Sequence, residues 1–208
     1  MSMALKLADR AQAEKPIRVG LIGAGKFGTM FLSQAQRTPG LHVVGVADLD
    51  LDRARRAFAM IGAAPDRAAA RSIGDALAGG LTFLTDDALA LIAADGLEVI
   101  VEATGSPAAG IKHALACCQR QRHVVMVNVE ADALAGPLLS RRAADAGVLY
   151  SLAYGDQPAL IAELVDWARV LSFEIVCAGK GDEIRARIPL FDARDRLEPL
   201  RFHPGSAR

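Results

Sequence analysis

A glycine-rich turn between an apolar strand and a helix constrains this chain more than any other feature of its sequence. Residues 19–28 read VGLIGAGKFG, which places three glycines in a Gly-x-Gly-x-x-Gly pattern after the strand. In such a turn the first glycine permits the tight bend, and the second lets a pyrophosphate approach the backbone. The third lets the new helix pack closely on the sheet. The residues that we therefore expect to contact a dinucleotide are Gly23, Gly25, Lys26, Phe27 and Gly28.

An acidic residue, Asp48, ends the next apolar run, about 20 residues after Gly28, which is the spacing of the dinucleotide fingerprint. A carboxylate at this position accepts hydrogen bonds from the adenosine ribose and repels a 2′-phosphate, so the sequence favours NAD over NADP. Arg53, Arg55 and Arg56 follow on the next predicted helix. These arginines either neutralise such a phosphate, if the loop folds back, or form an exposed helical face.

Composition and charge narrow the class of protein. The 208 residues suffice for one full domain and part of another. Hydrophobic residues make up 52% and aromatic residues only 5%, which is typical of helices packed on a parallel sheet. Lys plus Arg and Asp plus Glu both total 24, so no excess positive charge is available for nucleic acid. Without a signal peptide or an apolar run of roughly 20 residues, we expect no membrane contact and a cytoplasmic protein.

Segments with strand and helix character alternate along the chain, which predicts an α/β fold with a doubly wound parallel sheet of the Rossmann type. The predicted strands are 17–22, 42–47, 82–84, 97–103, 123–127, 148–153 and 173–178. The predicted helices are 25–37, 50–61, 66–77, 88–94, 106–119, 133–146 with an interruption near Gly136, and 158–171. The expected organisation is a helical extension over 1–15, a dinucleotide-binding domain over 16–155, a helix–strand unit over 156–181 that starts a truncated second domain, and an irregular tail over 182–208.

Ligands of such sheets bind outside the carboxyl ends of the strands, so the residues that follow each strand are the candidates for chemistry. Thr104 and Gly105 follow the fourth predicted strand, where small residues let the second half of a cofactor lie against the backbone. Asn128 and Glu130 follow the fifth, near the expected nicotinamide position, although a solvated loop is an equal alternative there.

The histidines and cysteines do not indicate a metal site or a catalytic thiol. His113 and His123 are predicted to be surface or core histidines rather than catalytic bases. Cys117, Cys118 and Cys177 are too few and too poorly spaced for a disulfide framework or a zinc site. We expect them to be reduced, interior residues, and we expect no metal.

Several stretches together resemble a known family. They are Gly23–Gly28, Val44–Asp48, Val101–Gly105, Val124–Asp132 and Tyr150–Lys180. Over roughly residues 16–181 they look like the N-terminal part of homoserine dehydrogenase-like NAD(P)-dependent oxidoreductases that carry a C-terminal SAF domain. That family includes a 1-deoxy-D-xylulose-5-phosphate reductoisomerase-like branch, and the cofactor halves of Gfo/Idh/MocA oxidoreductases are more distantly similar.

The resemblance implies hydride transfer between NAD(P) and a small polar substrate, either phosphorylated or not. It also implies that Glu130, Asp156 and Lys180 are acid, base or substrate-binding groups. Asn128 is followed by Val129, where homoserine dehydrogenases have lysine, and Asp48 stands where the reductoisomerase-like branch has a basic residue. Two interpretations follow: an oxidoreductase, completed by self-association if a homo-oligomer forms, or a truncated nucleotide-binding module without turnover.

Overall fold

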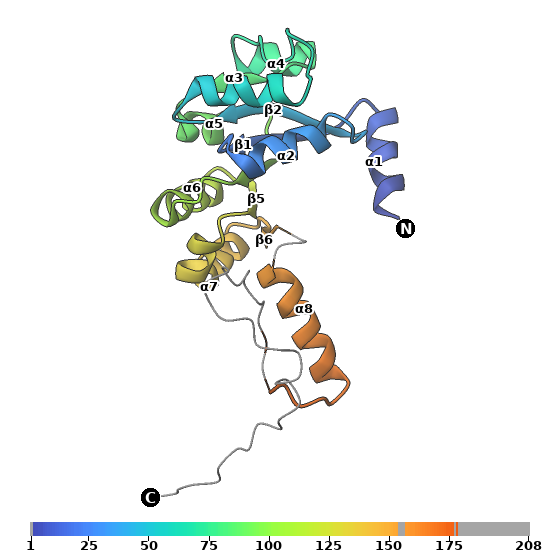
Figure 1. Ribbon diagram of the computed structural model, residues 1–208, viewed down its shortest axis with the longest axis vertical. Coiled ribbons are helices and arrows are strands. Elements are labelled where there is room, and N and C mark those ends of the chain that lie inside the picture. Colours follow the sequence, from blue (N-terminus) through green and yellow to red (C-terminus); the bar gives the residue numbers. More distant parts are fainter. Residues whose placement is uncertain (1, 154–156, 177, 179–208) are drawn as a thin grey trace, which may run out of the picture. The chain divides into compact units, whose positions relative to one another are not determined.

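Six strands form one parallel sheet in the order β3-β2-β1-β4-β5-β6 in the computed structural model of the chain (Figure 1). The structure describes residues 2–153, 157–176 and 178. It divides the chain into two compact units, residues 1–164 and 165–208. The strands, all in the first unit, are β1 (Ile17–Ile22), β2 (Leu41–Ala47), β3 (Phe83–Thr85), β4 (Val99–Glu102), β5 (His123–Met126) and β6 (Tyr150–Leu152). This order is that of the doubly wound Rossmann sheet, and the predicted fold class is confirmed.

Eight helices are present in the described part of the chain. They are α1 (Met3–Gln12), α2 (Lys26–Ala35), α3 (Leu51–Met60), α4 (Ile73–Gly79), α5 (Ala88–Ala93), α6 (Pro107–Gln119), α7 (Val129–Asp145) and α8 (Gln157–Val170). Helix α8 crosses the boundary between the two units. None of these helices is long and apolar enough to span a membrane.

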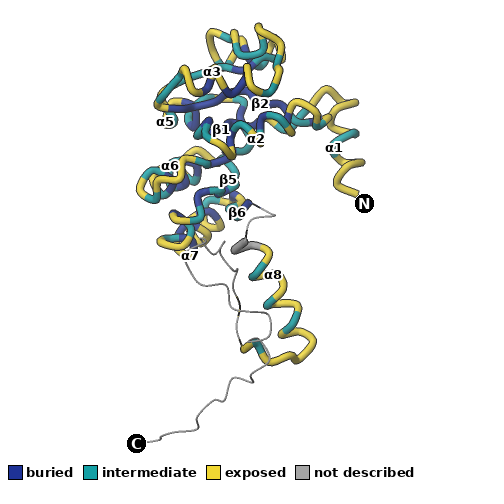
Figure 2. Tube along the Cα trace, viewed as in Figure 1, coloured by how far each residue is buried: buried dark blue, intermediate teal, exposed yellow. Residues whose placement is uncertain are grey.

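Two apolar clusters, one on each face of the sheet, make up the core. Helices α2 and α3 pack on one face against buried strand residues such as Leu21 and Val46. Helices α4 to α7 contribute to the cluster on the other face, which includes Ile100 and Met126. Figure 2 shows the buried residues concentrated along the strands between these helices. Both faces of the central strands are therefore covered, which explains their continuous apolar runs.

The register of the sheet brings the carboxyl ends of the central strands to one edge. Ile22 at the end of β1 lies beside Ala47 of β2 on one side and beside Glu102 of β4 on the other. Glu102 in turn lies beside Met126 of β5. Residues that follow β1, β2, β4 and β5 therefore meet at this edge of the sheet, where we look for a site.

The predicted helix over 66–77 is wrong in its first half. The backbone of residues 66–72 forms turns and one bridge, and α4 begins only after Ser72, whose side chain caps it. Ala70 pairs with Phe83, and the carbonyl of Arg67 accepts a hydrogen bond from the Thr82 N–H. Contacts with the sheet thus override the helix preference of an alanine- and arginine-rich segment.

Two other predicted elements also need correction. Helix α7 begins at Val129 rather than 133, because the Asn128 side chain caps it, and it runs without interruption through Pro137. The Asp132 carboxylate occupies the space beside Gly136 that a side chain would need there. Residues 173–176, predicted as part of a seventh strand, form no strand in the structure.

The prediction of interior cysteines holds for Cys117 but only in part for Cys118. Cys117 and Cys118 are free thiols, Cys117 buried and Cys118 half-buried. Burial raises the pKa of the Cys117 thiol to about 12. A thiol this hard to deprotonate is a poor nucleophile, so Cys117 serves packing. Cys177 lies outside the described residues.

Candidate cofactor-binding site

The three glycines of the turn after β1 have different structural roles. Gly23 has a φ of +101°, and a Cβ there would lie 2.6 Å from the Ala103 carbonyl oxygen. A Cβ at Gly28 would overlap the carbonyl oxygen of Gly23. At Gly25, which caps the N-terminus of α2, a Cβ would meet nothing within 4 Å. Gly23 and Gly28 are thus needed for packing, whereas Gly25 leaves open space where the first N–H groups of α2 can bind an anion.

Asp48 connects the end of β2 to this turn. Its Oδ2 accepts a hydrogen bond from the Ala24 N–H at 2.7 Å, and its Oδ1 accepts one from the Asp50 N–H at 2.8 Å. Arg53 Nη2 lies 3.1 Å from the same Oδ1. The Asp48 side chain is only 6% exposed. The carboxylate therefore fixes the glycine turn at the end of β2.

A cleft of about 590 Å³ opens beside these residues, a volume within the usual range of small-molecule sites. Its floor is the glycine turn and the end of β2, and its walls come from the N-terminal regions of α5 and α6. Both apolar and charged groups line it. The lining residues outside the glycine turn include Asp48, Leu49, Arg53, Asp86, Leu89, Thr104, Lys112 and His113.

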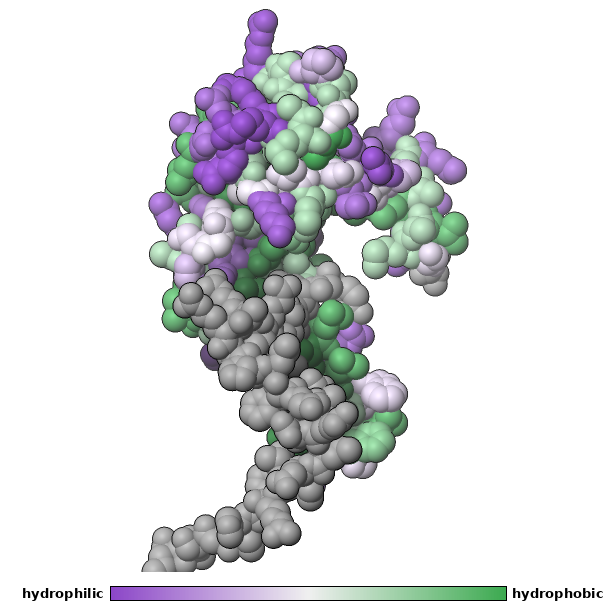
Figure 3. Space-filling view, in the orientation of Figure 1, coloured by the Kyte–Doolittle hydropathy of each residue, from purple (hydrophilic) through white to green (hydrophobic). Residues whose placement is uncertain are grey.

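The arginines of α3 divide between the cleft and the surface. Arg53 lines the cleft and contacts Asp48, whereas Arg55 pairs with Asp52 at 2.7 Å and Arg56 with Asp50 at 3.2 Å. Hydrophilic side chains gather over the region of α3 in Figure 3. The exposed helical face is therefore the correct interpretation for Arg55 and Arg56, and Arg53 alone faces the site.

A buried polar network joins the ends of β4 and β5 below the cleft. Thr104 Oγ1 donates to Glu102 Oε1 at 2.6 Å and lies 3.3 Å from the amide nitrogen of Asn128, which donates to it. That same nitrogen donates to the Ser106 carbonyl at 2.8 Å. His113 Nδ1 lies 3.1 Å from Glu102 Oε1. The hydrogen bonds of the Thr104 hydroxyl therefore orient its own loop. A ligand in the cleft would meet mainly the backbone of this loop.

A second polar contact lies between α7 and β6. The Tyr150 hydroxyl donates to Asp132 Oδ1 at 2.9 Å. Burial, together with the hydrogen bond to Asp132 and the negative charges of Asp132 and Glu102, holds the pKa of Tyr150 well above its usual value. Tyr150 therefore keeps its proton under physiological conditions and acts as a hydrogen-bond donor.

The structure brings only some of the predicted site residues together. Those that line the cleft are Gly23, Gly25, Asp48 and Thr104. Lys26 and Phe27 are exposed on the first turn of α2, Gly105 follows Thr104 with a φ of +70°, and Asn128 is buried in the network. Glu130 is exposed on the first turn of α7, away from the cleft lining. Asp156 and Lys180 lie outside the described residues.

Glu102 is the site residue that sequence reasoning passed over. It is fully buried at the end of β4, where its carboxylate holds both Thr104 and His113. The available signal was a single acidic residue ending an otherwise apolar run. His113, predicted as an ordinary histidine, lies on the cleft wall and contacts Glu102.

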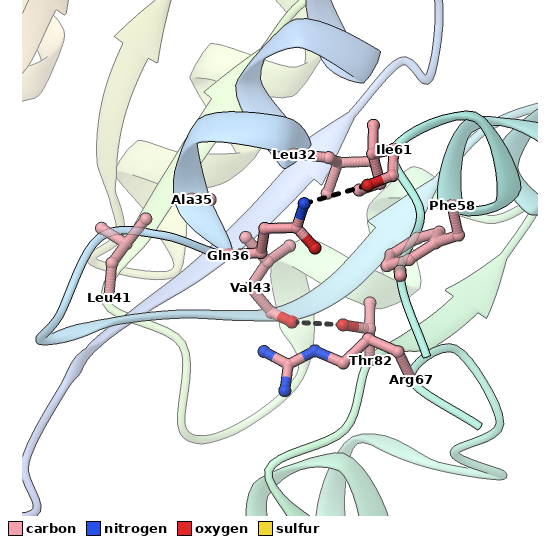
Figure 4. A pocket seen from close by; sticks show the side chains of 10 residues that line it. Leu32, Ala35, Gln36, Leu41, Val43, Phe58, Ile61, Arg67 and Thr82 are labelled. Atoms are coloured by element: carbon pink, nitrogen blue, oxygen red, sulfur yellow. Dashed lines mark hydrogen bonds between the residues drawn. The ribbon is translucent and has the colours of Figure 1, made fainter. Parts of the chain in front are cut away.

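A second hollow, between α2, α3 and β2, is not a cofactor site. Figure 4 shows its lining, with Gln36 donating to the Ile61 carbonyl and Thr82 donating to the Val43 carbonyl. Its volume of about 20 Å³ holds no more than a water molecule. Nor do the described residues contain a group of three or more His, Cys, Asp or Glu side chains that could hold a metal.

The chain resembles solved dehydrogenase structures in fold. A homoserine dehydrogenase from Thiobacillus denitrificans is 23% identical, with a TM-score of 0.55, over 75% of this chain and 34% of its own. An NAD-binding oxidoreductase from Klebsiella pneumoniae is 20% identical, with a TM-score of 0.50, over 74% and 39%. The WlbA dehydrogenase of Bordetella pertussis, solved with NADH and UDP-GlcNAcA, is 20% identical, with a TM-score of 0.51, over 74% and 43%. The chain thus spans less than half the length of these proteins.

Two family models match the sequence, and no curated protein does. Residues 155–193 match the catalytic domain of the oxidoreductase DRL, a stretch that lies mostly outside the described residues. Residues 17–128, more than half of the chain, match the Gfo/Idh/MocA model, described as an oxidoreductase family with an NAD-binding Rossmann fold. These residues contain the glycine turn, Asp48 and the whole cleft lining. The chain therefore belongs to the Gfo/Idh/MocA oxidoreductase family with its NAD-binding Rossmann fold.

Proposed function

We propose that the cleft binds NAD and that the chain is the cofactor-binding part of an oxidoreductase acting on a small polar substrate. The observation that carries this proposal is the link between Asp48 and the glycine turn, a 2.7 Å hydrogen bond to the Ala24 N–H. It holds a carboxylate beside the open space at Gly25. Ribose hydroxyls and a pyrophosphate require these two features next to each other.

The residues present fit the dinucleotide. Gly25 leaves room for the pyrophosphate at the N-terminus of α2, where the helix dipole favours a negative group. Leu49 and Leu89 both line the cleft and supply apolar surface for the adenine. Asp48 is placed to accept hydrogen bonds from the ribose. Bound NAD would supply a hydride acceptor, while this chain orients it and excludes water from one side.

The preference for NAD over NADP rests on charge. Asp48 repels a 2′-phosphate, but Arg53 lies against it and offsets part of that charge. Because the Asp48 carboxylate keeps its hydrogen bonds to the Ala24 and Asp50 N–H groups, it stays in place when Arg53 moves. We therefore propose NAD as the main cofactor, with a measurable residual affinity for NADP.

The finer assignment to a homoserine dehydrogenase-like activity rests on the resemblance of the sequence. The match of residues 155–193 to the catalytic domain of the oxidoreductase DRL supports a catalytic role for that stretch. Within that stretch Asp156 and Lys180 are the proposed acid, base or substrate-binding groups. A hydride donor needs such groups on the substrate side to supply or take up a proton. Glu130, exposed and outside the cleft lining, contributes only if a substrate-binding part of the enzyme covers the first turn of α7.

Fluorescence titration with NADH and NADPH tests the cofactor proposal. Wild-type protein should bind NADH with the higher affinity, and Asp48→Asn should weaken NADH binding about tenfold or more while raising the relative affinity for NADPH. Asp52→Asn is the matched control, because Asp52 is 72% exposed and outside the cleft lining. Equal loss of affinity in both variants, or tighter binding of NADPH than NADH by the wild type, would contradict the proposal.

Turnover is tested separately, with hydroxy acids, aldehydes and phosphorylated polyols as substrates and NADH absorbance as the signal. Activity should be lost in Asp156→Asn and Lys180→Met, with cofactor affinity retained. Asp166→Asn, an exposed acid on α8, is the control. Cofactor binding without turnover on any of these substrates favours the alternative of a nucleotide-binding module.

A further inference from the structure

Glu102 is a buried carboxylate that the binding of the cofactor does not by itself explain. The residue is 0% exposed, and its Oε2 has no hydrogen-bond partner within the described structure. A charge removed from water in this way costs several kcal/mol unless it is paired. A buried polar atom without a partner calls for a specific role rather than a packing explanation.

The groups around Glu102 could compensate a negative charge on its carboxylate only in part. His113 on α6 and Thr104 contact Oε1 only. Gly110 allows α6 to approach closely, since a Cβ there would lie 3.2 Å from Oε2 and 2.8 Å from Asn128 Nδ2. On α7, Asp132 adds a further negative charge nearby, which Tyr150 contacts. Among the described residues no lysine or arginine forms an ion pair with Glu102.

The topology places this charge on one particular half of the site, a step that rests on the proposed function. A dinucleotide crosses the sheet between β1 and β4, where the strand order reverses. Asp48, at the end of β2, takes the adenosine half on the β2 side. The nicotinamide half then belongs on the β4 side, where Glu102 is the last strand residue and lies beside Ile22 of β1.

We propose that Glu102 holds a fixed negative charge beneath the nicotinamide half of the site and thereby selects the oxidised cofactor. NAD⁺ and NADH have nearly the same size and the same diphosphate and riboses, but the oxidised nicotinamide ring carries one additional positive charge. A carboxylate held in a dry environment discriminates between the two forms by that charge alone. Glu102 therefore raises the affinity for NAD⁺ relative to NADH, so that a larger share of the sites holds NAD⁺ at a given ratio of the two cofactors.

Calorimetric titration with NAD⁺ and NADH tests this inference in the full chain. The measured quantity is the ratio of the two dissociation constants, Kd for NAD⁺ over Kd for NADH. Glu102→Gln preserves the volume and the acceptor for Thr104 but removes the charge, so the ratio should rise about tenfold, the order expected for one partly screened charge.

Two control variants separate charge from packing. Thr104→Val breaks the same network without changing its charge, and should weaken both cofactors equally, leaving the ratio unchanged. Glu98→Gln removes a carboxylate four residues earlier, just before the opposite end of β4, and should also leave the ratio unchanged. An unchanged ratio in Glu102→Gln, with both cofactors still bound, would overturn the inference but leave the proposed function intact. Failure of the wild-type protein to bind either cofactor would overturn both.

If Glu102→Gln does not fold, a second variant tests whether charge near Glu102 changes the ratio of the two dissociation constants. Asn128→Asp adds a carboxylate near Glu102 and keeps a helix cap for α7, because an aspartate oxygen can accept the Ala131 N–H as the asparagine oxygen does. It loses the amide donations to Thr104 and Ser106 and should therefore weaken the binding of both cofactors. The added charge should lower the ratio of dissociation constants severalfold. A folded Asn128→Asp protein with the wild-type ratio would show that charge at this position does not discriminate between the two forms.

Discussion

The guanidinium of Arg53 lies 3.1 Å from Asp48 Oδ1, so the group that would attract a 2′-phosphate is held by the group that would repel it. Asp48 is almost buried, whereas the Arg53 side chain is half exposed. The carboxylate is also fixed by the N–H groups of Ala24 and Asp50. The arginine is therefore the mobile partner, and its position decides how strongly the site rejects a phosphate.

Arg53→Gln should sharpen the preference for NADH. Removal of the cation leaves the Asp48 charge without its neighbour, so NADPH affinity should fall about tenfold, while NADH affinity changes little. Fluorescence titration with both cofactors measures the effect. Arg55→Gln, on the same helix but paired with Asp52, should change neither affinity. Equal weakening of both cofactors in Arg53→Gln would mean that Arg53 contacts a part they share.

Substitutions at two glycines of the turn should have different effects, one mainly on cofactor affinity and the other mainly on the free energy of unfolding. Gly25→Ala points a methyl group into open space, so the free energy of unfolding should fall by about 1 kcal/mol or less, the cost of alanine at a helix N-cap. The methyl group should obstruct the pyrophosphate and weaken NADH binding. Gly28→Ala forces α2 away from the Gly23 carbonyl and should cost about 2 kcal/mol or more. Urea unfolding and NADH titration of both variants check this. Destabilisation by Gly25→Ala as large as that of Gly28→Ala would contradict the assigned roles.

The fold could be predicted from local pattern because each strand and helix of the sheet carries its own signal. The glycine turn, Asp48 and the caps at Ser106 and Asp87 all indicate their elements without tertiary information. The prediction of a helix over 66–77 is wrong in its first half for the opposite reason. The alanines and arginines of residues 66–72 favour a helix, but Thr82 and Phe83, the partners that hold this segment in turns and a bridge, are more than ten residues away.

Candidate site residues could be predicted only where they belong to a known sequence motif. Asp48 was identifiable from its distance to the turn, since the fingerprint fixes that spacing. Glu102 was not, because its importance depends on complete burial and an unpartnered oxygen, neither of which a sequence displays. For Asn128, which the sequence predicts as a cofactor contact, the structure adds two roles that no motif indicates: it caps α7 and holds the Thr104 loop. Its role depends on how two helix ends meet in space.

Arg122 should prove to be a stabilising residue that its sequence context does not reveal. Its guanidinium donates to the carbonyls of Leu97 and Ala94 at 2.8 Å and to that of Ile92 at 3.4 Å, tying the loop before β4 to the end of α6. Lysine cannot reproduce this planar set of donors, so Arg122→Lys should lower the free energy of unfolding by about 2 kcal/mol. Arg120→Lys, at an exposed position, should change it by less than about 0.5 kcal/mol. Equal stabilities of the two variants in urea unfolding would contradict this role.

Stability should fall at alkaline pH, in part because of Cys117. Burial raises the pKa of this thiol from its ordinary value of 9.0 to about 12, so the folded state holds the proton more tightly than the unfolded state does. The resulting stabilisation is complete below pH 9.0 and is lost as the pH rises toward 12, by up to a few kcal/mol.

Cys117→Ala should reduce the slope of unfolding free energy against pH in this window, although the small cavity lowers stability at every pH. Cys118→Ala is the matched control, since Cys118 is only half-buried and should change the slope much less. Urea unfolding at several pH values within this window measures the slopes, and identical slopes for wild type and Cys117→Ala would show that the thiol does not contribute.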